Sequence, residues 1–160
     1  MLFRSSDAQL SIFFDCDFTL TGIHGGLRPY VREVFERLTS EGHHVYIWSG
    51  VRVPWDIYNN FDLQQFIRGV YFKPIDEHHE QLPLLKIPVV PDFVVDDNVG
   101  PVEAFGGYVV PPYIYVDKPD DHLWRAYEVF AAWAGQRRTT PGLPAPRTGS
   151  AWRPDPPAQG

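Results

Sequence analysis

Short apolar runs alternate with amphipathic stretches along most of the chain. The runs have the length of buried strands and fall at residues 10–14, 45–48, 69–72 and 93–95. The stretches between them have helical spacing or mixed polar character, which indicates crossover helices. This alternation predicts an α/β fold: a Rossmann-like three-layer α/β/α sandwich with a mainly parallel central sheet.

Helices are predicted at three places. Pro29 opens the first, in which the apolar residues share one helix face, and Gly42 ends it. The mixed stretch 54–68 predicts a second helix, and the amphipathic stretch 123–133 predicts a closing one. The Pro111-Pro112 pair limits any strand over residues 108–116 to an edge of the sheet.

The composition changes near residue 136. Prolines, glycines, threonines and arginines replace the periodic apolar residues there. No stretch of this tail buries enough apolar surface to offset the entropy of ordering it. We therefore expect one domain over residues 1–135 and a disordered tail over residues 136–160.

Charge and cysteine content narrow the class of protein. A formal net charge of -6 argues against a broad nucleic-acid-binding face. Cys16 is the only cysteine, so the chain forms no internal disulfide and no cysteine cage for zinc. The apolar stretch before Asp15 is far shorter than the ~20 residues of a membrane span. These features predict a cytoplasmic protein with no membrane partner.

Polar residues suited to phosphate chemistry follow the predicted strands. In an open α/β sheet the ligand crevice lies outside the carboxyl ends of the strands, so we expect these residues to converge. In chain order they are Asp15, Asp17 and Thr19, then Ser49 and Gly50, then Lys73, and finally Asp96 and Asp97.

This order of residues resembles the four motifs of the haloacid dehalogenase (HAD)-like phosphohydrolases. The resemblance covers roughly residues 10–98 and begins with the Asp-x-Asp-x-Thr pattern of that family. It implies a small Mg²⁺-dependent phosphatase that hydrolyses phosphomonoesters through an aspartyl-phosphate. The implied roles are nucleophile for Asp15, general acid and base for Asp17, catalytic hydroxyl and ammonium for Ser49 and Lys73, and an acidic metal-binding pair for Asp96 and Asp97.

Elementary chemistry agrees with these roles. Asp15 can attack phosphorus while Asp17, two residues on, protonates the leaving oxygen and later activates water. Two carboxylates ~4 Å apart repel by about 4 kcal/mol at an effective dielectric near 20, so a cation is expected among them. Mg²⁺ prefers such hard oxygen ligands. The expected ligands are Asp15, the Asp17 carbonyl and one of Asp96 and Asp97, of which we favour Asp96.

Phosphate recognition is expected from Thr19, Ser49, Gly50, Arg52 and Lys73. Arg52 can clamp a phosphate or carboxylate of the substrate, although a loop arginine is more often only exposed to solvent.

Lys73 competes with Lys86 for the role of the motif lysine. Lys86 leaves little room for a helix and crossover before Asp96, so Lys73 is preferred. Phe18 departs from the family pattern, because many relatives have glycine before the threonine of the first motif.

The loops after the first two strands are too short to hold a large cap domain. An open pocket then requires either a substrate that fills the mouth or a second subunit that covers it. The expected substrate is a phosphorylated small molecule or macromolecular end, and residues 21–26 are the expected flap. The alternative is a non-catalytic HAD-fold protein that binds phosphate or a partner.

Overall fold

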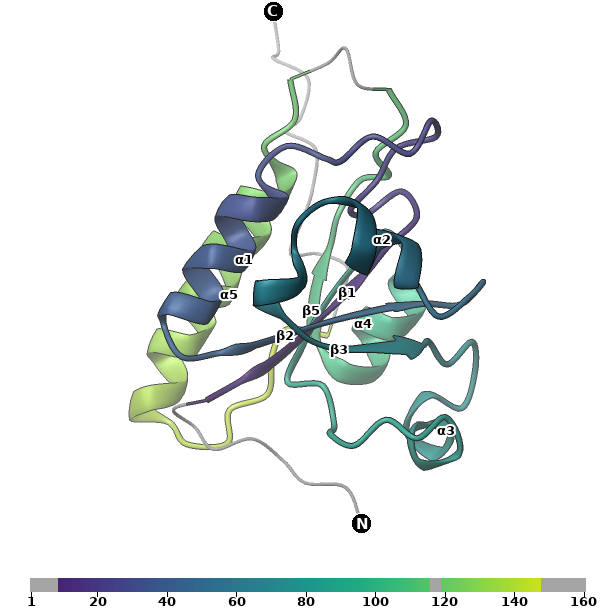
Figure 1. The fold of residues 1–160 in the computed structure, drawn as a ribbon. Coiled ribbons are helices and arrows are strands. Elements are labelled where there is room, and N and C mark those ends of the chain that lie inside the picture. Colours follow the sequence, from purple (N-terminus) through teal and green to yellow (C-terminus); the bar gives the residue numbers. More distant parts are fainter. Residues whose placement is uncertain (1–8, 116–118, 148–160) are drawn as a thin grey trace, which may run out of the picture.

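The computed structural model describes residues 9–115 and 119–147 and has an α/β fold (Figure 1). Five parallel strands form one sheet in the order β3-β2-β1-β4-β5. The strands are β1 (Ser11–Asp15), β2 (His44–Ser49), β3 (Ile67–Phe72), β4 (Phe93–Asp96) and β5 (Gly107–Val109). The helices are α1 (Val31–Ser40), α2 (Trp55–Asn60), the 3₁₀ turn η1 (Gln64–Phe66), α3 (His78–Leu84), α4 (Val99–Phe105) and α5 (His122–Thr139). The predicted α/β fold with a Rossmann-like parallel sheet is confirmed.

Helices cover both faces of the sheet. Ile12 and Phe14 of β1 point into a core formed with α1, α2 and α5, where α1 and α5 lie side by side (Figure 1). Phe13, between them, points into a second core formed with α3 and α4. The strands are therefore apolar on both faces, as parallel strands between two helical layers must be. Within the described ranges, no helix combines the length and the apolar character that crossing a bilayer requires.

The central strand β1 pairs with β2 on one side and β4 on the other. Asp15 lies opposite Trp48 of β2, and Phe14 lies opposite Val95 of β4. From β1 the chain builds outward through β2 and β3, then returns to β4 and builds outward in the other direction. The topological switch point therefore lies between β1 and β4, where ligands bind in open α/β sheets.

The expected single helix over residues 54–68 is wrong. The segment contains α2, the short turn η1 and the start of β3 at Ile67. Asp62 has a φ of 55°, in the left-handed region that no right-handed helix can include. The expected edge strand is real but short, because β5 ends at Val109, before the two prolines.

The tail boundary expected at residue 136 is also wrong. α5 continues to Thr139, and the chain then turns back against it. The Leu143 carbonyl accepts hydrogen bonds from Trp133 Nε1 and Arg137 Nη1, both at 3.1 Å. Ala145 is buried in the first core. Residues 148–160, the rest of the predicted tail, lie outside the described residues.

Gly107 permits the close approach of β5 to β4. Its φ is 150°, and a Cβ built there would lie 1.8 Å from the carbonyl oxygen of Val94. We expect Gly107→Ala to lower the free energy of unfolding by about 3 kcal/mol or more, because only backbone can move to relieve that contact. Urea denaturation measures the change.

Gly135, in α5, is the matched control. A Cβ there meets nothing within 4 Å, so Gly135→Ala should stabilise the fold by about 0.5–1 kcal/mol. Equal stability of the two alanine variants would contradict the proposed role of Gly107.

Candidate functional site

Three strand ends bring their polar residues together. Asp15 ends β1, Asp96 ends β4, and Lys73 directly follows β3. The ammonium of Lys73 lies 3.0 Å from Asp15 Oδ1 and 3.0 Å from Asp96 Oδ2. Lys86 is instead an exposed residue that follows α3. Of the two candidate lysines, Lys73 is therefore the one at the carboxylates.

The hydroxyl of Thr19 joins the first and last segments of the cluster. Its Oγ1 accepts a hydrogen bond from the backbone N–H of Asp97 at 3.1 Å. It also lies 3.2 Å from Asp15 Oδ2 and 3.2 Å from Asp97 Oδ1, and its one proton can serve either carboxylate. Thr19 is fully buried, so these hydrogen bonds hold Asp15 and Asp97 in a fixed relation.

Asp15, Asp96 and Asp97 form a group that can hold a metal ion. One carboxylate oxygen of each lies within 4.8 Å of the others. Burial, with the charge of Asp96, raises the pKa of Asp15, and burial likewise raises the pKa of Asp96. Burial lowers the pKa of Lys73, but Asp96 and Asp15 outweigh that effect and raise it. One ammonium among three carboxylates leaves excess negative charge, which a divalent cation with oxygen ligands would offset.

The Asp17 carboxylate lies outside this group and is held by Arg52. Arg52 Nη1 donates to Asp17 Oδ2 at 2.9 Å and Nη2 to Asp17 Oδ1 at 3.3 Å, while Nε and Nη2 also bind Asp56. These hydrogen bonds raise the pKa of Arg52 and lower that of Asp56. Both side chains of the Asp17–Arg52 pair are about one-third exposed, where ion pairs contribute little and exchange readily. The backbone carbonyl of Asp17, and not its carboxylate, was expected to bind the metal beside Asp15 and Asp96. That expectation stays a prediction.

The end of β2 supports Lys73. The carbonyl of Ser49 accepts a hydrogen bond from the backbone N–H of Lys73 at 2.8 Å. The buried hydroxyl of Ser49 accepts from the N–H of Val51 at 3.1 Å, which leaves its own proton available to a ligand. A Cβ on Gly50 would lie 3.6 Å from Lys73 Cε, so even the smallest side chain would stand against the lysine.

The turn after β1 accommodates the bulky Phe18. Its φ is 65°, in the left-handed region that favours glycine. The carbonyl of Cys16 accepts hydrogen bonds from the N–H groups of Thr19, Leu20 and Thr21, which closes the turn. Cys16 is fully buried, as expected for a small core residue.

Sequence reasoning missed Arg28, which is buried behind this turn. Its guanidinium forms a two-pronged ion pair with Asp120, with distances of 2.9 and 3.0 Å. It also donates to the carbonyls of Thr19 at 3.3 Å and Pro111 at 2.8 Å, and lies over the ring of Tyr113. Arg28 thus ties the backbone of Thr19 to the segment after β5. The sequence carries no local signal for a contact between residues 28 and 120.

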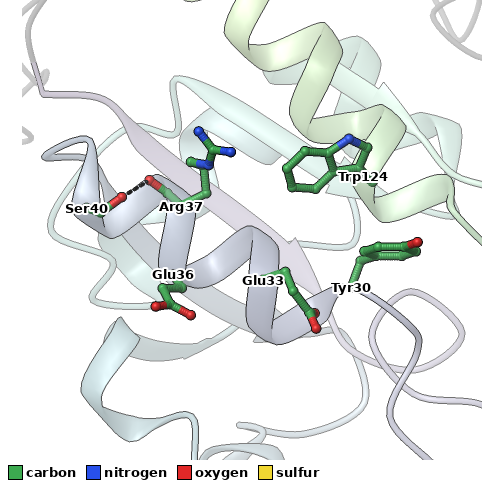
Figure 2. A pocket seen from close by; sticks show the side chains of 6 residues that line it. All are labelled: Tyr30, Glu33, Glu36, Arg37, Ser40 and Trp124. Carbon is green, nitrogen blue, oxygen red and sulfur yellow. Dashed lines mark hydrogen bonds between the residues drawn. The ribbon is translucent and has the colours of Figure 1, made fainter.

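A surface groove between α1 and α5 does not belong to this site. Figure 2 shows its lining, with Tyr30 and Trp124 on one side of the view and acidic residues of α1 below. The guanidinium of Arg37 lies 5.8 Å from the centre of the Trp124 ring. None of the predicted site residues lines this groove, so the strand-end cluster is the candidate site.

Comparison with known proteins does not extend this description. No family model matches the chain, and no curated protein matches it. The fold and site by themselves define an α/β protein with a Rossmann-like parallel sheet and a buried group of aspartates, at the switch point, that can hold a metal ion.

Asp120→Ala should destabilise the fold, because it leaves the charge of Arg28 buried without its carboxylate. We expect a loss of about 3 kcal/mol in the free energy of unfolding, measured by urea denaturation. Asp121 is the control: its ion pair with Arg125 is about half exposed, so Asp121→Ala should cost less than about 1 kcal/mol. Similar losses for both variants would show that Arg28 does not depend on Asp120.

Proposed function

We propose that the protein is a HAD-like, Mg²⁺-dependent phosphomonoester hydrolase that forms an aspartyl-phosphate on Asp15. The observation that carries the proposal is the 3.0 Å contact of one largely buried ammonium, that of Lys73, with both Asp15 and Asp96. Strand ends far apart in sequence supply these groups in the order that resembles the HAD-like motifs. Their position at the switch point is where a ligand is expected.

Asp15 is suited to be the nucleophile. The hydroxyl of Thr19 and the ammonium of Lys73 fix its carboxylate. One carboxylate oxygen attacks phosphorus, and the bond from phosphorus to the ester oxygen breaks. A water molecule then attacks the aspartyl-phosphate, so that inorganic phosphate leaves and the Asp15 carboxylate is restored.

Asp17 supplies and recovers the proton. It gives a proton to the leaving alcohol oxygen in the first step and takes one from the attacking water in the second. Arg52 contacts both carboxylate oxygens of Asp17, so this ion pair must open before Asp17 can reach the leaving oxygen. Because both side chains of the Asp17–Arg52 pair are partly exposed, breaking the ion pair costs little free energy. The freed guanidinium can then bind the phosphate of the substrate.

The aspartate group fits Mg²⁺ through its chemistry as well as its spacing. Asp15, Asp96 and Asp97 would hold the ion, which supplies positive charge against the phosphate oxygens. Lys73 and the hydroxyl of Ser49 add a cation and a hydrogen-bond donor for the same oxygens.

The second candidate is a phosphate-binding or interaction protein that does not catalyse. It is favoured by one observation, the occupation of both Asp17 carboxylate oxygens by Arg52. Such a protein would bind phosphate and release none from an ester. Turnover of a generic aryl phosphate distinguishes the two candidates.

Asp15→Asn and Asp17→Asn should each lower kcat on phenyl phosphate by about 100-fold or more, because they remove the nucleophile and the proton-transfer group. Release of inorganic phosphate in the presence and absence of Mg²⁺ is the measurement. Asp62→Asn, which changes an exposed aspartate outside the site, should keep wild-type activity.

Lys73→Ala should also lower kcat by about 100-fold, whereas Lys86→Ala should not, because only Lys73 contacts the carboxylates. Equal rates for Lys73→Ala and wild type would reject the role of Lys73.

Mg²⁺ should stabilise the fold by binding to the aspartate group. At a free concentration of about 100 times its Kd, a ligand specific to the folded state adds about 2.7 kcal/mol to the free energy of unfolding. We expect the Mg²⁺-induced rise in Tm to be lost in Asp96→Asn and kept in Asp62→Asn, whose side chain is 88% exposed. An unchanged rise in Asp96→Asn would place the bound ion elsewhere.

A further inference from the structure

Exposed apolar side chains gather at one edge of the sheet. With the exception of Leu84, the large apolar side chains that are exposed in the described residues all lie in the stretch from the carboxyl end of a strand to the first residue of the next helix. These residues are Phe18, Ile23, Tyr30, Val51, Val53, Trp55, Ile75, Val99, Ile114 and Tyr115. Exposed apolar side chains on one edge of a sheet are a candidate binding surface.

Six of these side chains follow the catalytic segments most closely, and we call them the apolar rim. They are Phe18, Val51, Val53, Trp55, Ile75 and Val99. Their exposed fractions run from 37% for Phe18 to 76% for Val51. Phe18 keeps its side chain there although its backbone conformation favours glycine, which costs about 1 kcal/mol.

The apolar rim adjoins the buried cluster. Val51 donates its backbone N–H to the hydroxyl of Ser49. A Cβ placed on Gly50 would lie 3.8 Å from Ile75 Cγ1 and 3.6 Å from Lys73 Cε, so Ile75 and the lysine flank the same glycine. The side chain of Lys73 is 11% exposed and that of Asp15 is 8% exposed. A phosphate must therefore pass the apolar rim to reach these two side chains. Only the group attached to that phosphate remains at rim level.

Charge limits what that group can be. In the described segments between strand ends and the helices that follow, each arginine and lysine is already paired: Arg28 with Asp120, Arg52 with Asp17, and Lys73 with Asp15. Exposed carboxylates, including Asp76 and Glu77, stand at the same edge. If Arg52 leaves Asp17 to bind the phosphate, it is occupied there and not by the leaving group. A leaving group with further negative charge would therefore meet repulsion from these carboxylates.

We propose that the apolar rim is a leaving-group subsite for small phosphomonoesters whose alcohol is an apolar alkyl or single-ring group without further negative charge. This inference rests on the proposed hydrolase function and names its substrate class. A slim apolar group fits because the phosphate must descend past the rim to reach Asp15. Nucleotides and oligonucleotide ends carry additional charge or polar surface that this edge does not match.

Three aryl esters with leaving phenols of similar acidity test the proposal: phenyl phosphate, 4-butylphenyl phosphate and 4-carboxyphenyl phosphate. We expect kcat/KM of the wild type to be about tenfold higher for the butyl ester than for phenyl phosphate, since each buried CH₂ favours binding. The carboxy ester should be about tenfold poorer than phenyl phosphate. Equal values for the butyl and phenyl esters, or preference for the carboxy ester, would overturn the proposal.

Matched variants locate the effect. Val51→Ser and Ile75→Ser should each bring the butyl-to-phenyl ratio of kcat/KM towards one. Leu84→Ser changes a side chain of similar exposure, 72% against 73% for Ile75, and should keep the wild-type ratio. A ratio that survives both rim changes, or that falls equally in Leu84→Ser, would contradict the assignment.

A binding measurement separates this inference from the proposed hydrolysis. With Mg²⁺ present, calorimetry should give about tenfold tighter binding of 4-butylbenzylphosphonate than of benzylphosphonate to the wild type, and a smaller difference in Ile75→Ser. Tighter binding without turnover of any ester would reject the hydrolase and keep the subsite. Equal binding of the two phosphonates would reject the subsite. A wild-type dimer that Ile75→Ser converts to a monomer in light scattering would also reject it, because a second copy of the chain would then cover the rim.

Discussion

Burial of two aspartates, Asp15 and Asp96, around one ammonium is the constraint on which the site depends. Parallel strands must all end at the same edge, so Asp15 and Asp96 reach the same buried place. Lys73 is held there by the end of β2, through the Ser49 carbonyl. Removing one charged partner from such a cluster leaves uncompensated charge in a low dielectric, which costs more than an exposed ion pair contributes. The same excess of negative charge makes the cluster suited to a divalent cation.

Much of the fold and of the cluster could be predicted from the sequence because their signals are local. Four of the five strands contain a short apolar run, and Asp15, Lys73 and Asp96 each stand directly after one. The first helix was predicted from its apolar face and its stop at Gly42, and α1 ends at Ser40. Once the strands are known to be parallel, their carboxyl ends must share an edge, so the convergence of Asp15, Lys73 and Asp96 follows from topology.

The rest depends on contacts that no local pattern encodes. Arg28 and Asp120 lie on segments that meet only in the folded chain. The Arg52 clamp on Asp17 depends on the path of the loop after β2, which spacing does not fix. The tail boundary was misplaced because the order of residues 140–147 comes from packing against α5 and β5, whereas the composition of that stretch indicates disorder.

The described loops after β1 (residues 16–30) and β2 (residues 50–54) contain no helix or strand that could cover the site, so water must be excluded by other means. In water, Lys73 and a bound cation would stabilise phosphoryl transfer far less than in a dry pocket, because a high dielectric weakens each interaction. The turn after β1 is closed by its own hydrogen bonds and by Arg28, so it forms a fixed wall of the site. Beside a second subunit, the substrate itself can then supply the cover. An apolar leaving group seated among Phe18, Val51 and Ile75 would displace water from the mouth at the moment the phosphate reaches Asp15. The shortness of the described loops after β1 and β2 and the apolar character of the rim thus favour the same substrate chemistry.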